Sequence, residues 1–456
     1  MSEAPDLTKA AASASDAAQE TRSAPLDRPL SHYLNPFVAP DAPPPIVDPW
    51  AVPLETLNPI DGRLFQQQLH WEHFRRLRAE DPVHFNELPK VGRYWSITRF
   101  DDVLAIDKDH ERFRSGHGIA LGLALDEPRP ETMLPTSSFI GMDPPKHDEQ
   151  RATVQGVVAP RNLAKLEATI RARTQRVLDD LPVGEPFDWV DRVSIELTTT
   201  MLATLLDFPF DERRRLTRWS DVATATPGTG IVDSAEQRRA ELLECLECFT
   251  GIWNERMARG EPGDDLISML AYGEKTRHMQ PFEFLGNLLL LIVGGNDTTR
   301  NTMSASVLGL NRNPAEYDKL RADPSLIPNM VSEVIRWHTP LPYMRRTAAV
   351  DVELRGKTIR AGDQVLMWYV SGNRDETVIE APDQLIIDRE RARHHLSFGF
   401  GIHRCMGNRL AEMQLRILWE EIQARFREVE VVGQESRLNS SFVHGITELP
   451  VQVHPH

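Results

Sequence analysis

Cysteine is scarce in this sequence, with Cys245, Cys248 and Cys405 the only examples in 456 residues. Three thiols cannot form a disulfide framework in a chain of this size, so we expect a reducing compartment. Long apolar runs are lacking too. The longest, Leu288 to Val293, is too short to cross a bilayer, and no basic and apolar signal segment opens the chain. These absences predict a soluble, cytoplasmic protein without a membrane anchor.

Positive charge is also in short supply. The 52 Lys and Arg residues are outnumbered by 67 Asp and Glu residues, which leaves a net charge of −15. This balance argues against nucleic acid as a partner and against an anionic lipid surface. The apolar share of 41% is nevertheless enough for a sizeable core.

The first 45 residues differ in composition from the rest. They are rich in Ala, Ser, Asp and Pro and bury little apolar surface, so we expect a disordered or extended tail over residues 1–45. No internal repeat and no low-complexity linker follows this segment. Residues 46–456 are therefore expected to form a single domain.

Helical periodicity dominates the body of the chain. From Arg238 to Met257, for example, apolar residues recur along one stripe of a helix. The predicted fold class is therefore mainly α with a small β region. The few predicted strands are Tyr94–Ile97, Val350–Ile359 with a turn at Gly356, Gln364–Val370, and a C-terminal pair around Phe442 and Val451.

Several familiar motifs are incomplete. Cys245-x-x-Cys248 has the spacing of a zinc or redox site, but no second pair exists and Cys245 falls on the apolar face of a predicted helix, which favours a core residue. Gly399-x-Gly401 has Arg404 where a dinucleotide loop needs its third glycine. Neither a His-Glu-x-x-His motif nor a Gly-x-Ser-x-Gly elbow occurs, which excludes the zinc-protease and serine-hydrolase classes.

The segment Ser397–Gly407 carries the strongest signal. Its spacing is Phe398-x-x-Gly401-x-x-x-Cys405-x-Gly407, and an amphipathic helix follows the cysteine. Backbone N–H groups and the dipole at a helix N-terminus stabilise the thiolate, the form of cysteine that binds metal. The glycines remove Cβ atoms where a flat cofactor would lie against the backbone. A structural thiol in a glycine-rich turn is the alternative for a lone cysteine, but the full spacing favours a cofactor ligand.

This loop resembles the haem-binding signature of the cytochromes P450, the haem-thiolate monooxygenases. The resemblance implies haem b as the cofactor, Cys405 as its iron ligand, and Phe398 and Gly399 in contact with the haem. It also implies the fold of the family, a helical triangular prism with the haem between a long helix and the helix after Cys405. A thiolate ligand enables the haem to activate O2 for insertion into an unactivated C–H bond.

A second motif agrees with the resemblance. Glu333-Val-Ile-Arg336 matches the Glu-x-x-Arg pair of the family, and residues three apart on a helix can form an ion pair. Helix pairs of this kind are common by chance, so the match indicates the family only in combination with the cysteine loop. In the family a later arginine completes this structural cluster, and Arg389 is our candidate.

Residues Phe282 to Leu310 are predicted to form one long helix with Gly294 and Gly295 in its middle. Glycines inside a helix cost roughly 1 kcal/mol each relative to alanine, so we expect a functional reason for them. Gly294-Gly295-Asn-Asp297-Thr298 resembles the oxygen-activation motif of the family, where the helix bulges over the haem. The resemblance implies that Gly294 lies at the haem and that Asp297 and Thr298 are catalytic residues that deliver protons to bound O2. A solvated helix face is the alternative, which the preceding apolar run disfavours.

Buried haem propionates require cationic partners. His147 and Arg151 are four residues apart in a predicted helix whose N-cap is Asp143. The resemblance implies that both positions bind propionate, together with Arg346 and His403. Four such side chains are consistent with two carboxylates.

No flavin or reductase domain follows His456, so electrons are expected from a separate protein. The resemblance implies a [2Fe–2S] ferredoxin and an NAD(P)H-dependent ferredoxin reductase. Ferredoxins are acidic, and a local positive patch can steer docking despite the negative net charge. For Arg391 and Arg393, docking and internal ion pairing are the two alternatives. The arginines near the cysteine are Arg389, Arg391, Arg393, Arg404 and Arg409.

Three segments, 294–301, 344–348 and 395–409, are similar to the bacterial terminal alkane and fatty-acid hydroxylases. That branch oxidises the end methyl of medium-length chains. This methyl has a stronger C–H bond than the neighbouring methylenes, so a narrow channel must present only the chain end to the iron. The segment 116–141 departs from the pattern of the branch. The residues expected to bind the hydrophobic substrate are Leu290, Val293, Gly294, Leu341, Met344 and Phe442.

Three functional hypotheses follow from the sequence. The first is a ferredoxin-dependent ω-hydroxylase of alkanes or fatty acids that uses O2. The second is a monooxygenase of a compact terpenoid or aromatic substrate, with the same chemistry and a different pocket. The third, from another class, is a haem-thiolate sensor or binding protein without turnover, and the intact Asp297-Thr298 pair argues against it.

Overall fold

Helices make up most of the chain that the computed structural model describes, which comprises residues 43–228 and 230–456. The predicted fold class, mainly α with a small β region, is confirmed. The tail predicted for residues 1–45 lies almost wholly outside the described residues. The helices are α2 (Gly62–Gln66), α3 (His70–Glu80), α4 (Phe100–Lys108), α5 (Lys146–Val154), α6 (Pro160–Asp179), α7 (Glu196–Leu206), α8 (Arg214–Thr224), α9 (Ala235–Arg259), α10 (Leu266–Tyr272), α11 (Pro281–Arg312), α12 (Pro314–Ala322), α13 (Ile327–His338), α14 (Tyr369–Gly372) and α15 (Asn408–Arg425).

The strands of residues 43–228 and 230–456 form four small sheets. The largest has the order β1-β2-β8-β5-β3, in which β2 and β8 are parallel and the other neighbours antiparallel. The others are β4-β12-β9, β10-β11 and the hairpin β6-β7. The strands are β1 (Val83–Leu88), β2 (Gly92–Ile97), β3 (Phe113–Arg114), β4 (Phe187–Asp188), β5 (Tyr343–Ala348), β6 (Val352–Leu354), β7 (Lys357–Ile359), β8 (Gln364–Trp368), β9 (Phe426–Val431), β10 (Ser436–Arg437), β11 (Ile446–Glu448) and β12 (Pro450–Pro455).

Most of the strand predictions are confirmed, including the hairpin β6-β7 with its turn at Gly356, whose φ is +76°. Strand β8 ends earlier than predicted because Tyr369 begins the short helix α14. The prediction of a strand at Phe442 was wrong. This residue lies in a bend where the Ser440 hydroxyl accepts hydrogen bonds from the N–H groups of Phe442 and Val443, and the strand pairing resumes only at β11.

The long helices form where the sequence supplies both an apolar stripe and a start signal. Helix α9 begins after Ser234, whose hydroxyl accepts a hydrogen bond from the N–H of Gln237, and it ends at Gly260 with a φ of +75°. The predicted stripe lies inside this helix with its apolar residues buried, among them Cys245 as a core residue. Helix α11 starts with Pro281 at its first position, where a missing N–H costs nothing.

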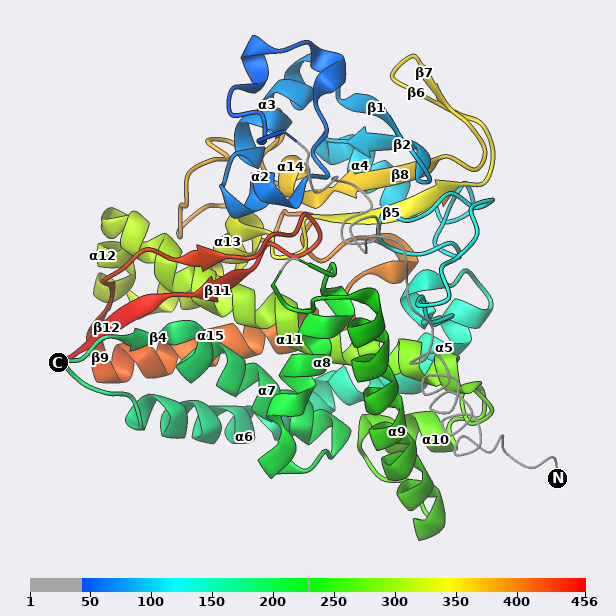
Figure 1. Cartoon of the computed structure of the whole chain (residues 1–456). Coiled ribbons are helices and arrows are strands. Elements are labelled where there is room, and N and C mark those ends of the chain that lie inside the picture. Colours follow the sequence, from blue (N-terminus) through cyan, green and yellow to red (C-terminus); the bar gives the residue numbers. More distant parts are fainter. Residues whose placement is uncertain (1–42, 229) are drawn as a thin grey trace.

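Helix α11 runs through the middle of the molecule (Figure 1). Helices α7, α8, α13 and α15 pack against it, and one hydrophobic core cluster includes its N-terminal half while a second includes its C-terminal half. The five-stranded sheet lies at one end of the molecule, next to α3, α4 and α14. Within the described part of the chain, none of the helices has the length and apolar character needed to span a membrane.

Candidate active site

A cavity that is partly open to solvent lies between α7, α11, β5 and the loop before α15. Thr298 and Cys405 both face it. The six residues that were expected to bind substrate all belong to its lining, so the fold brings together positions that are up to 152 residues apart. These are Leu290, Val293, Gly294, Leu341, Met344 and Phe442.

Sequence reasoning missed a further part of the lining. Ile119, Phe139 and Ile140 come from the segment 116–141 and face the same cavity. The N–H of Phe139 donates to the amide oxygen of Asn287 on α11 at 3.0 Å, which ties this segment to the long helix. No periodicity marks these residues, because Ile119 lies in irregular backbone and Phe139 and Ile140 lie in a 3-10 helix of three residues. Only the tertiary structure therefore places them at the cavity.

The cysteine loop folds back on itself before α15. The N–H of Cys405 donates to the carbonyl of Phe398 at 2.8 Å, and Gly399 and Gly401 have φ angles of +63° and +65°. A Cβ at Gly401 would approach the carbonyl oxygen of Asp107 at 2.4 Å, so this position has room only for glycine. The predicted helix begins at Asn408, three residues after the cysteine.

Two influences act on the Cys405 thiol in opposite directions. Burial raises its pKa, whereas the N–H groups of Gly407 and Asn408 and the charges of Arg151 and Arg404 lower it, with burial prevailing. A metal ion bound beside the thiol would favour its ionised form.

Four cationic or potentially cationic side chains gather at one side of the cavity. Arg151, Arg346 and His403 line it, and His147 lies behind them with its ring centroid 4.3 Å from that of His403. Neither ring nitrogen of His403 has a hydrogen-bond partner among the described residues, and Nε2 of His147 is likewise buried without one there. Burial, and then the charge of Arg346, lowers the pKa of His403 to about 2. Such a set of unsatisfied donors fits an anionic ligand.

The expectation that Asp143 caps the helix bearing His147 and Arg151 was wrong. Helix α5 begins at Lys146, after two prolines, and Pro145 occupies the cap position. The Asp143 carboxylate instead accepts the N–H groups of Ser115 at 2.9 Å and Gly116 at 3.2 Å. The prolines separate the carboxylate from the first turn and leave it free to order the segment that precedes the cavity wall.

Gly294 and Gly295 of α11 occupy different surroundings, and each explains the lack of a side chain in its own way. A Cβ at Gly294 would meet no heavy atom within 4 Å, so this position opens onto the cavity. A Cβ at Gly295 would lie 2.7 Å from Leu202, so the glycine permits close packing of α11 on α7. The expected bulge does not interrupt α11, which is continuous from Pro281 to Arg312. The local feature is a hydrogen bond from the Thr298 hydroxyl to the carbonyl of Gly294, at 3.2 Å.

Asp297 and Thr298 point in different directions, because consecutive residues on a helix are about 100° apart. Thr298 faces the cavity, whereas Asp297 is 1% exposed and turned toward α8. Its carboxylate accepts the Ser220 hydroxyl at 2.9 Å and lies 3.1 Å from the Arg300 guanidinium. Burial raises the pKa of Asp297, although Arg300 opposes this shift. The solvated-face alternative is therefore wrong for Asp297.

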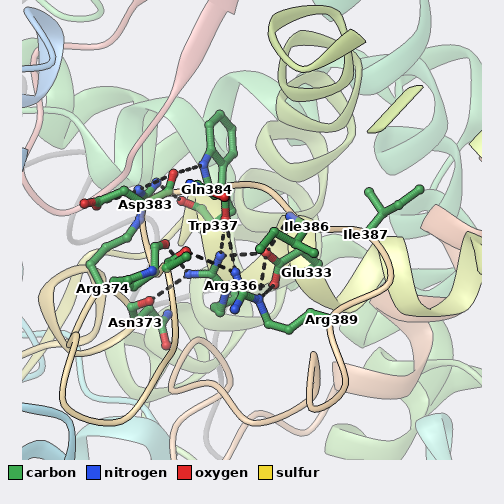
Figure 2. Close-up of polar contacts among 12 residues, drawn as sticks. Glu333, Arg336, Trp337, Asn373, Arg374, Asp383, Gln384, Ile386, Ile387 and Arg389 are labelled. Atoms are coloured by element: carbon green, nitrogen blue, oxygen red, sulfur yellow. Dashed lines mark hydrogen bonds and ion pairs between the residues drawn. The ribbon is translucent and has the colours of Figure 1, made fainter. Parts of the chain in front are cut away.

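Glu333, Arg336 and Arg389 form one buried cluster (Figure 2). The Glu333 carboxylate accepts Nε and Nη2 of Arg336 at 2.8 and 2.7 Å, and Nε of Arg389 at 3.1 and 3.0 Å from its two oxygens. The N–H of Ile386 also donates to it, at 3.0 Å. Arg336 in turn donates to the carbonyl of Asn373 at 2.9 Å. The structure thus places the Arg389 candidate against Glu333.

The arginines near the cysteine divide into two groups. Arg389 is engaged inside the protein, whereas Arg391, Arg404 and Arg409 are exposed. Arg393 has a side chain that is 76% exposed and lies 3.8 Å from Glu412, a weak surface pair. The exposure of Arg391 and Arg393 excludes internal ion pairing for them.

Comparison with known proteins agrees with this geometry. A family model, Cytochrome P450, matches residues 254–453. Linalool 8-monooxygenase of Pseudomonas putida is 33% identical over 400 residues, which cover 86% of this chain and 97% of that protein. The chain belongs to the cytochrome P450 family. A methyl-branched lipid omega-hydroxylase of Mycobacterium tuberculosis is 31% identical over 83% of this chain and 90% of its own.

Solved structures of other cytochromes P450 have the same fold. Cytochrome P450-153 from Novosphingobium aromaticivorans superposes with a TM-score of 0.81 and 45% identity, and covers 87% of this chain and 99% of its own. CYP153D17 from Sphingomonas sp. PAMC 26605 has a TM-score of 0.80 and 46% identity over 86% of this chain and 98% of its own. The fold predicted from the resemblance is confirmed.

As a cytochrome P450, the protein is a monooxygenase with haem b held by an axial cysteine thiolate. The cavity fits this group on three observations. Cys405 faces it, Gly294 leaves open space in its wall, and Arg151, Arg346 and the unsatisfied nitrogens of His403 suit the propionates. The cofactor prediction is therefore confirmed.

Proposed function

We propose that this cytochrome P450 is a ferredoxin-dependent ω-hydroxylase that oxidises the terminal methyl of medium-length alkanes or fatty acids. The observation that carries the proposal is the joint lining of one cavity by Thr298, Cys405 and all six expected substrate residues. The motifs shared with the terminal alkane and fatty-acid hydroxylases also support it.

The residues that we propose to bind the haem lie in or beside the same cavity. Cys405 holds the iron, and the bound haem supplies the activation of O2. Arg151 and Arg346 neutralise the propionates, and His403 donates from a ring N–H group. His147 is proposed to support the same group through Nε2, because its Nδ1–H already donates to the Asp148 carboxylate at 2.7 Å. A histidine needs only its neutral form to donate from one ring nitrogen, so the low pKa of His403 is compatible with this role.

Proton delivery is assigned to Thr298 with Asp297 behind it. The Thr298 hydroxyl donates to the Gly294 carbonyl at 3.2 Å, which leaves the lone pairs of its oxygen free to accept a hydrogen bond in the cavity. To pass its own proton into the cavity, the hydroxyl must first rotate away from that carbonyl and then take a replacement proton from a donor on its other side. Asp297 is held by Arg300 and Ser220. Asp297 can pass on a proton only if its carboxylate first separates from the Arg300 guanidinium. The proposed role of Asp297 therefore depends on the breaking of this ion pair.

Regiochemistry depends on the walls of the cavity. Leu290 and Val293 on α11 approach from one side, and Leu341, Met344 and Phe442 contribute apolar surface from other segments. An apolar channel offers no hydrogen bond that could orient a chain, so selectivity for the end methyl must come from shape.

Electrons are proposed to come from an acidic [2Fe–2S] ferredoxin that docks near Arg391 and Arg393. The exposed arginines near the cysteine loop would steer the encounter, and the global charge of −15 makes such a local patch necessary.

The deciding experiment is product analysis with a reconstituted electron-transfer chain. Dodecanoic acid and octane are offered separately, and the position of the hydroxyl is determined by mass spectrometry. We expect 12-hydroxydodecanoic acid or 1-octanol as the major product. Predominant hydroxylation at internal positions would contradict the proposal while leaving the monooxygenase class intact.

A compact terpenoid is the second candidate substrate, favoured by the 33% identity to a linalool 8-monooxygenase. A spin-state titration separates the candidates, because a substrate that displaces water from the iron shifts the Soret band. Dodecanoic acid, octane and a bicyclic terpene are compared. A shift with the terpene alone would favour the second candidate.

A further inference from the structure

One buried carboxylate connects the cysteine loop to the cavity wall. Asp107 lies in the last turn of α4 and is 3% exposed. Its Oδ1 accepts Nη2 of Arg346 at 2.8 Å, and its Oδ2 accepts the N–H of Phe400 at 2.6 Å and the hydroxyl of Tyr369 at 3.1 Å. Arg346 and Tyr369 line the cavity, and Phe400 is five residues before Cys405.

The contact between α4 and the cysteine loop is close. A Cβ at Gly399 would lie 3.1 Å from Oδ2 of Asp107, and one at Gly401 would lie 2.4 Å from its carbonyl oxygen. Lys108 stacks its ammonium 5.5 Å from the ring of Phe400. The loop that presents Cys405 is therefore seated on the end of α4, with the Asp107 carboxylate as its polar anchor.

Asp102, on the same helix, offers a contrast. Its carboxylate accepts Nε of Arg355 at 2.5 Å, but the Arg355 side chain is 47% exposed and no cavity residue is involved. Asp107 and Arg346 are both buried, with side chains 2% and 3% exposed. Charges that are buried together interact more strongly than charges in water, so the Asp107 charge bears directly on Arg346.

The pKa shifts of Asp107 and Tyr369 agree with the burial of the Asp107 carboxylate against Tyr369 and Arg346. Burial raises the pKa of Asp107, while Arg346, the Phe400 N–H and the Tyr369 hydroxyl oppose the shift. Burial and then the negative charge of Asp107 raise the pKa of Tyr369.

We propose that Asp107 is a positioning residue that fixes the cysteine loop and shares the Arg346 guanidinium with a haem propionate, and that it thereby sets the haem reduction potential. The inference rests on Cys405 as the iron ligand and on Arg346 as the proposed propionate partner, and not on the identity of the substrate. With Asp107 ionised, part of the positive charge of Arg346 is neutralised. Without it, the full charge of Arg346 acts on the haem and favours the reduced iron.

The test compares Asp107→Asn with the matched control Asp102→Asn, both as holoenzymes without substrate. Spectroelectrochemical titration gives the reduction potential, and transfer of haem to an excess of apomyoglobin gives the rate of haem loss. We expect Asp107→Asn to shift the potential to more positive values and to speed haem loss by at least roughly tenfold, since a charge-assisted hydrogen bond in the interior is worth about that factor or more. Asp102→Asn should match the wild type in both.

An Asp107→Asn protein with the wild-type value in either measurement overturns the proposal, even if it is less stable to heat. If this variant does not fold, Asp107→Glu is used in its place. It keeps the charge but displaces the carboxylate, so we expect the wild-type potential with faster haem loss, and a wild-type rate of haem loss overturns the proposal. The reduced carbon monoxide spectrum of the wild type tests the Cys405 ligand separately.

Discussion

Replacing Glu333 with glutamine would remove a fully buried negative charge while keeping the shape of the side chain. Glu333 is 0% exposed, and its carboxylate neutralises both Arg336 and Arg389 while accepting the N–H of Ile386. In Glu333→Gln two guanidinium groups lose their shared carboxylate. The amide NH2 group of glutamine would also replace one acceptor oxygen, so that a donor would face the N–H donors that surround the carboxylate.

The magnitude follows from the cost of breaking a buried ion pair. Removing one partner costs about 3–5 kcal/mol, because an uncompensated charge is left in the interior. Two arginines depend on the same carboxylate here, so we expect the free energy of unfolding to fall by an amount in the upper half of that range. The change should appear as reduced stability and poor recovery of folded protein.

The assay is urea unfolding of the haem-loaded protein, followed by far-ultraviolet circular dichroism. The matched control is Asp318→Asn, which breaks a surface pair with Arg321 at 2.6 Å whose carboxylate is 71% exposed. Exposed pairs contribute about 0–1 kcal/mol, so this variant should unfold close to the wild type. If Glu333→Gln unfolds at the same urea concentration as Asp318→Asn, the reasoning from buried charge is wrong.

Three further predictions concern the iron ligand, the proton path and the electron donor. Cys405→Ala should lose the red-shifted Soret band of the reduced carbon monoxide complex, whereas Cys245→Ala should keep it; a Cys405→Ala protein with that band would rule out the proposed ligand. Thr298→Ala should retain haem and substrate binding but divert reducing equivalents to hydrogen peroxide, measured as peroxide formed per NADH, because the hydroxyl that supplies the proton is gone; unchanged coupling would mean that another group delivers it. Arg393→Glu should slow the first electron transfer in stopped flow at low salt, with a defect that shrinks as salt rises, whereas Arg360→Glu, at a distant and 63% exposed position, should not; an Arg393→Glu protein with the wild-type rate would place the docking surface elsewhere.

Contiguous motifs made the family predictable from the sequence. The spacing around Cys405, the Glu333-x-x-Arg336 pair and the Asp297-Thr298 pair are each encoded within a few residues, so no tertiary information is needed to find them. The helical fold class was predictable for a related reason, because apolar residues spaced for a helix mark the face that packs on the core.

Other features depended on what surrounds a motif. Asp143 has the residue type of a helix cap, but two prolines place the start of α5 beyond its reach. Asp297 and Thr298 are adjacent in the sequence, yet only the packing of α8 against α11 decides that Asp297 pairs with Arg300 while Thr298 faces the cavity.

For Asp107, the sequence could indicate a buried carboxylate, but only the tertiary structure shows its partners. A carboxylate on the buried stripe of α4, next to Val103 and Ile106, is a sequence signal that could have been noticed. The partners of Asp107 could not have been predicted from the sequence, because Phe400 and Arg346 are 293 and 239 residues away from it.

The sequence by itself determined the family, the cofactor and the helical architecture, since these depend on local spacing and on periodic burial. The tertiary structure alone decided which side chains share the cavity and which charges meet in the interior. Long-range contacts of this kind arise from how helices and loops pack, and packing depends on the shapes of many side chains at once rather than on any single motif.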